Sequence, residues 1–116
     1  MNSAGFRDYE RSKNKPENGL RIALLEDYHT GVLQVKRQDT YGAIMEEKLK
    51  QCPVLKNRKV EVMNFGVSGY STAQELMTLR HHVWDYQPDL VILAFYAGND
   101  LSNNSPNLEH DHLRPY

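Results

Sequence analysis

Three short apolar segments, at 21–25, 60–63 and 90–96, alternate with two helix-like patterns, and a polar block follows each of them at once. Strands that alternate with helices predict right-handed β-α-β crossovers and a parallel sheet. The carboxyl ends of parallel strands lie at one edge of the sheet, where open α/β proteins gather their binding and catalytic groups. We therefore expect the three polar blocks to meet.

The first segment between strands predicts a helix that begins near Asp39 or Thr40, since either residue can cap it. Apolar residues then recur at helical spacing from 41 to 49. The second segment predicts a helix over 71–86, because capping-box patterns begin at 71 and 72. Its apolar face is expected to include Trp84.

Composition limits the classes of protein that this chain can belong to. It has 116 residues, 40% of them hydrophobic and 25% charged, which suits one globular domain. The formal net charge of −1 gives no reason to expect nucleic acid as a partner. The longest apolar stretch is too short to span a bilayer, and the first residues hold no secretory signal. We expect a soluble protein whose compartment is left open by the single cysteine, Cys52.

The predicted fold is α/β, a flavodoxin-like three-layer α/β/α sandwich with a three-stranded parallel sheet in the order 2-1-3. Residues 1–19 are expected to form an extended arm and loop, with Gly5-Phe6 as an anchoring contact, and residues 20–116 the domain. The third strand is the most apolar, and its near-continuous apolar run predicts burial on both faces. If it lies at the sheet edge, it offers unpaired backbone groups for a homo- or hetero-oligomer.

The polar blocks are Glu26-Asp27-Tyr28, the run NFGVSGYST at 64–72 and the run AGND at 97–100. In content, order and spacing they resemble the SGNH (GDSL-type) hydrolases, serine esterases and acyl hydrolases on a flavodoxin-like fold. The likeness covers nearly the whole chain but only about the first half of a family domain.

The resemblance implies hydrolysis of a small acyl or carbohydrate ester, with no cofactor and no metal. Tyr28 stands at the position of the nucleophilic serine. Gly69, through its N–H group, and Asn99, through its side chain, stand at the oxyanion-hole positions. Asp27 and Asp100 stand at supporting positions beside them.

Two departures from the family argue against activity in this chain. Tyr28 replaces the serine, and a phenol with a pKa of about 10 yields little nucleophile at neutral pH. Glu26 adds negative charge beside a site that must stabilise an oxyanion. The chain also ends at Tyr116, before the family's late Asp-x-x-His block, so we expect a truncated domain. Glu109-x-x-His112 has a similar spacing but stands in the wrong place in the family's order.

Other interpretations of the same residues stay open. Asn99-Asp100 fits an Asx-type turn that ends a strand, and Gly69 fits a turn glycine with positive φ. Glu26-Asp27 also resembles the acidic pair that holds Mg²⁺ in receiver domains of the same general fold. A non-enzymatic module that completes its sheet with another chain is a further function class.

Overall fold

A parallel sheet of three strands forms the centre of the computed structural model, which describes residues 1–27 and 34–108. The strands are β1 (Gly19–Leu25), β2 (Lys59–Asn64) and β3 (Leu90–Leu93), in the order β2-β1-β3. In the register of the sheet, Ile22 of β1 is aligned with Val62 of β2 and with Leu90 of β3. The predicted fold class and strand order are confirmed.

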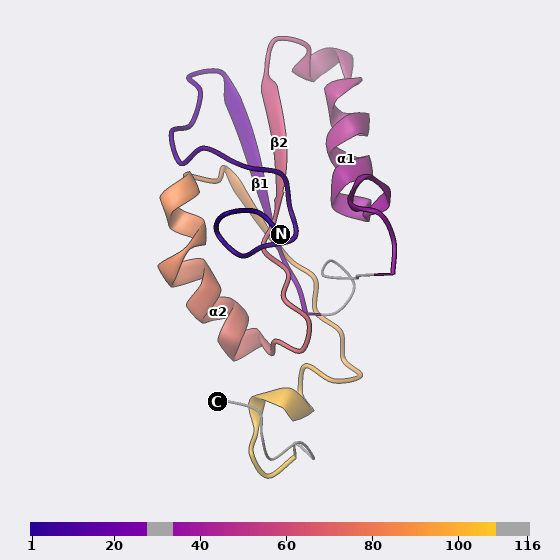
Figure 1. Cartoon of the computed structure of the whole chain (residues 1–116), viewed down its shortest axis with the longest axis vertical. Coiled ribbons are helices and arrows are strands. Elements are labelled where there is room, and N and C mark those ends of the chain that lie inside the picture. Colours follow the sequence, from indigo (N-terminus) through magenta and orange to yellow (C-terminus); the bar gives the residue numbers. More distant parts are fainter. Residues whose placement is uncertain (28–33, 109–116) are drawn as a thin grey trace.

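Helices α1 (Tyr41–Lys50) and α2 (Thr72–His81) cover opposite faces of this sheet (Figure 1). Side chains alternate along β1, so Ile22 and Leu24 pack with residues of α1, whereas Ala23 and Leu25 face the α2 side. Short 3-10 turns accompany these elements at Arg37–Asp39, Pro53–Leu55, Val83–Tyr86 and Ser102–Asn104. The layers are therefore helix, sheet and helix. In the described part of the chain, no helix has the length and apolar character needed to cross a membrane.

The helix starts follow their capping signals, but the second helix ends earlier than predicted. Thr40 caps α1 through Ala43 N–H, and the Gln74 side chain accepts from Ser71 N–H at 2.8 Å to begin α2. The predicted helix over 71–86 stops at His81, and a 3-10 turn follows. The break brings Val83 and Tyr86 into the core and leaves Trp84 half-exposed, so its expected place on the apolar face was wrong.

The prediction for the third strand was wrong in extent and burial. The strand ends at Leu93 instead of continuing to 96, and the side chains of Leu90 and Leu93 are half-exposed. The reason lies in the strand order, because β3 has β1 on one side and no other described strand on its outer side. With only one neighbouring strand among the described residues, the apolar side chains at the two ends of β3 stay half-exposed.

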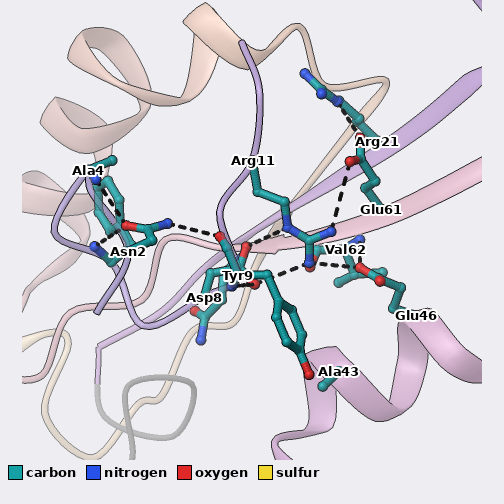
Figure 2. Close-up of polar contacts among 12 residues, drawn as sticks. Asn2, Ala4, Asp8, Tyr9, Arg11, Arg21, Ala43, Glu46, Glu61 and Val62 are labelled. Carbon is teal, nitrogen blue, oxygen red and sulfur yellow. Dashed lines mark hydrogen bonds and ion pairs between the residues drawn. The ribbon is translucent and has the colours of Figure 1, made fainter. Parts of the chain in front are cut away.

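The opposite edge of the sheet, along β2, is closed by the N-terminal arm and α1. Phe6 is buried in the core, as expected, with its ring edge-on to Phe65 at 5.0 Å between centroids. The Arg11 guanidinium lies between the carboxylates of Asp8 and Glu46 and also donates to the Val62 carbonyl (Figure 2). Side chains thus occupy the hydrogen-bonding positions that another strand would use.

Candidate functional site

The first and third polar blocks meet at the carboxyl ends of β1 and β3. Asp27 lies two residues past β1, and Asn99 lies in the loop that follows β3. The Asn99 side-chain amide donates a hydrogen bond to the Asp27 carboxylate. Two of the predicted site residues are therefore in direct contact, whereas Tyr28, at the nucleophile position, lies outside the described residues.

The second block joins this edge through backbone contacts. Val67 N–H donates to the Glu26 carbonyl at 3.1 Å, and Tyr70 N–H closes a turn onto the Val67 carbonyl at 3.1 Å. Gly69 lies in that turn with φ of +82°, in the left-handed region that favours glycine. The turn requires a glycine here whether or not its N–H serves an oxyanion.

Asp100 organises the third block from a fully buried position, with 0% of its surface exposed. One carboxylate oxygen accepts from Tyr96 N–H at 2.6 Å. This donor lies four residues before Asp100, so the contact is not the Asx-type turn that was expected, in which the side chain bonds the backbone two residues later. The other oxygen has no hydrogen-bond partner within the described ranges, 1–27 and 34–108. Burial, together with the charge of Asp27, raises the pKa of Asp100 against the lowering effect of the Tyr96 hydrogen bond.

Glu75 is a fourth member of this edge that the sequence analysis did not identify. It projects from α2, is 2% exposed, and neither of its oxygens has a hydrogen-bond partner in the described part of the chain. Burial and then the charges of Asp100, Asp27 and Glu26 raise the pKa of Glu75 to about 7. In the sequence, Glu75 stood out only as the last residue of a capping-box pattern that begins at Thr72. In the structure the capping contact is made by Gln74, which accepts from Ser71 N–H.

Asn104 ties the third block to the start of α2, a role that the polar composition of its segment did not reveal. Its side-chain oxygen accepts from Ala73 N–H at 3.0 Å, and its amide donates to the Asp100 carbonyl. The positions of Asp100 and of the first turn of α2 are thereby linked. The alternative Glu109-x-x-His112 pair lies outside the described residues.

Negative charge dominates this edge of the sheet. Glu26, Asp27, Glu75 and Asp100 are all buried, and the charges of the other three raise the pKa of Glu75. Among residues 1–27 and 34–108, no three His, Cys, Asp or Glu side chains are grouped so that they could hold a metal ion. Such a site favours hydrogen-bond donors and cations and opposes the formation of an anion.

Comparison of the chain with protein-family models, with curated proteins and with solved structures found no match.

Proposed function

We propose that this chain carries the first part of an SGNH-type ester-hydrolase domain whose site no longer hydrolyses esters. The hydrogen bond between Asp27 and Asn99 is the observation that carries the proposal. It joins the residue beside the nucleophile position to the amide that the family uses for the oxyanion. Two blocks 72 residues apart in the sequence thus converge as a shared substrate site requires.

The loss of hydrolysis follows from the residues at the site. Removing the nucleophilic serine of a serine hydrolase lowers the rate of the chemical step by about six orders of magnitude. Tyr28 carries its hydroxyl on a long, rigid ring, so its oxygen extends past the position of a serine oxygen. An un-ionised phenol is also a weak nucleophile at neutral pH.

The electrostatics of the site also disfavours ester hydrolysis. A tetrahedral ester intermediate carries an oxyanion, which hydrogen-bond donors must stabilise. Here one Asn99 N–H is already engaged by Asp27, and the charge of Asp27 acts on the buried carboxyls of Glu75 and Asp100. Their negative potential raises the energy of the intermediate, so the remaining donors are insufficient for catalysis.

Hydrolysis of p-nitrophenyl acetate by the purified chain tests the first half of the proposal. We expect the rate to equal that of buffer, and Tyr28→Phe and Asn99→Ala to change nothing. Turnover that exceeds buffer and disappears in both variants would contradict the loss of activity. Circular dichroism of each variant shows whether it remains folded.

Binding of a neutral ester analogue tests the second half, retention of the family site. In an NMR titration with N-ethylbutyramide, we expect amide shifts at Gly69, Asn99 and Asp100. Asn99→Ala should weaken the titration, whereas Asn107→Ala, an exposed asparagine nearby, should leave it unchanged. Shifts confined to other parts of the chain would contradict an ester-hydrolase origin of this site.

A further inference from the structure

The turn that joins α1 to β2, residues 51–58, lies at one end of the long axis of the molecule (Figure 1). It contains an apolar run, Cys-Pro-Val-Leu at 52–55, which includes the 3-10 turn Pro53–Leu55. Val54, at the centre of that turn, is 88% exposed, the highest value among the large hydrophobic residues that the structure describes. A single exposed apolar side chain is common on protein surfaces, so its meaning depends on what surrounds it.

Positive charge flanks this apolar run on both sides. Residues 47–59 contain one carboxylate, Glu47, and five cationic residues, namely Lys48, Lys50, Lys56, Arg58 and Lys59. All five cationic residues are exposed. The formal net charge of −1 for the whole chain therefore conceals a basic end of the molecule.

Several of these cations have no carboxylate partner. Among residues 1–27 and 34–108, the side chains of Lys48, Lys56 and Lys59 form no ion pair. Lys50 pairs with carboxylates of its own helix, at 2.7 and 3.3 Å. A cation in the last turn of a helix, such as Lys48, also stabilises the helix dipole. Lys56 and Lys59 lie outside any helix, so the dipole does not account for them.

The turn is held in place by the segment that precedes β1. Arg58 donates to the carbonyl oxygens of Asn18 and Gly19, at 3.1 and 3.0 Å. The Asn18 side chain donates to the Asn57 carbonyl at 3.2 Å. These bonds fix the turn without neutralising the guanidinium, so a partner meets a surface that is already ordered. The adjoining segment 14–18 adds one lysine and one glutamate, which leaves the excess of positive charge in place.

An apolar side chain framed by lysine and arginine matches the chemistry of an anionic lipid surface. Basic side chains are attracted to the negative headgroups, and an apolar side chain enters the boundary between the headgroups and the acyl chains. Nucleic acid would attract the same cations, but its phosphate groups give an exposed valine nothing to bury against. The combination of Val54 with its basic surroundings therefore favours lipid over nucleic acid.

We propose that the 51–58 turn docks this chain reversibly on the surface of an anionic lipid bilayer. Val54 inserts at the level of the headgroups, and Lys56 and Lys59 contact the negative charges around it. The turn precedes β2, whereas the candidate site lies past the carboxyl ends of β1 and β3, so the site faces away from the bilayer (Figure 1). The proposal does not depend on the ester-hydrolase origin of the fold.

Co-sedimentation of the intact chain with lipid vesicles tests this proposal. We expect binding to phosphatidylcholine vesicles that contain about 30% phosphatidylserine, none to pure phosphatidylcholine, and release at high salt. Lys56→Ala and Lys59→Ala should each raise the dissociation constant about fivefold, and Val54→Ser about tenfold. Lys36→Ala and Val35→Ser, at exposed positions before the start of α1, are the matched controls and should leave it unchanged.

A second measurement locates the inserted residue. The fluorescence of Val54→Trp should shift to the blue with anionic vesicles, relative to the native chain, whose single tryptophan is Trp84. No binding to anionic vesicles at low salt would overturn the proposal, and equal binding to pure phosphatidylcholine would overturn the role of charge. Binding that is unchanged in Val54→Ser and equally tight for a DNA duplex would overturn lipid insertion and leave a general surface for polyanions.

Discussion

The Glu46 carboxylate of α1 accepts a hydrogen bond from Val62 N–H of β2 at 2.8 Å, and so occupies a position that a neighbouring strand would otherwise take. The same carboxylate pairs with Arg11 of the N-terminal arm at 2.8 Å (Figure 2). It also pairs with Lys50 at 2.7 Å. One buried side chain thus connects helix, strand and arm. It closes the sheet edge along β2.

Glu46→Ala should lower the free energy of unfolding by about 3 kcal/mol, because it leaves the buried Arg11 with one partner fewer and exposes the Val62 N–H. Urea denaturation followed by circular dichroism measures the change. Glu47→Ala is the matched control, since the Glu47 side chain is 68% exposed, and its effect should stay within about 0.5 kcal/mol. Equal losses in the two variants would show that the edge contact adds no stability.

Glu75 should make the protein less stable as pH rises through the neutral range. Its pKa is about 7 in the folded chain against 4.5 without the fold, so the folded state binds more protons between these values. Stability from this group is fully present below pH 4.5, declines up to about pH 7, and is then level. The total decline is at most about 3 kcal/mol.

Glu75→Gln removes this titration, so the variant should lose the decline between pH 4.5 and 7 and melt at a higher temperature than the native chain at pH 8. Thermal unfolding at a series of pH values, with both chains held at low concentration, measures the difference. Parallel curves for the two chains would show that Glu75 keeps an ordinary pKa.

The contact between Asp27 and Asn99 should appear as a coupling energy. Hydrogen bonds to charged groups contribute about 1.5–3 kcal/mol, so Asp27→Ala and Asn99→Ala should be non-additive by about 1.5 kcal/mol. Urea denaturation of both single variants and of the double variant gives this value directly. Additive losses would mean that the two polar blocks do not act on one another.

Arg21→Lys should destabilise the chain by about 2 kcal/mol although the charge is kept. The buried guanidinium donates to Glu61 at 2.7 Å, to the Tyr86 carbonyl at 2.7 Å and to the Ser12 carbonyl at 2.6 Å. A lysine cannot reproduce this planar set of bonds. Arg80→Lys, at an exposed arginine of α2, is the control and should cost little; comparable losses would indicate a general effect of the lysine side chain.

Local signals predicted the elements of this fold well. The apolar run at 21–25 and the capping residue Thr40 lie where a strand and a helix start were expected. Strand alternation and helix capping depend on neighbouring residues alone, so they can be inferred from sequence. The early end of α2 was missed because it follows from the burial of Val83 and Tyr86 against residues far along the chain.

The candidate site was predicted only in part, for a similar reason. Asp27 and Asn99 were identified because each follows a strand, and the sheet brings strand ends together. Glu75 was missed because its pKa depends on burial between α2 and the sheet and on the charges of other carboxylates, neither of which is visible in its own segment.

The sequence by itself determined the α/β class, the strand order and the convergence of three polar blocks, because hydrophobic period and crossover handedness leave few topologies open. Only the tertiary structure decided which carboxyl groups, such as Glu75, are buried without a hydrogen-bond partner among the described residues. It also decided that side chains occupy the hydrogen-bonding positions along the β2 edge. Those properties depend on contacts between segments as distant as Asp8 and Asn64, whose energies arise only when the chain is folded.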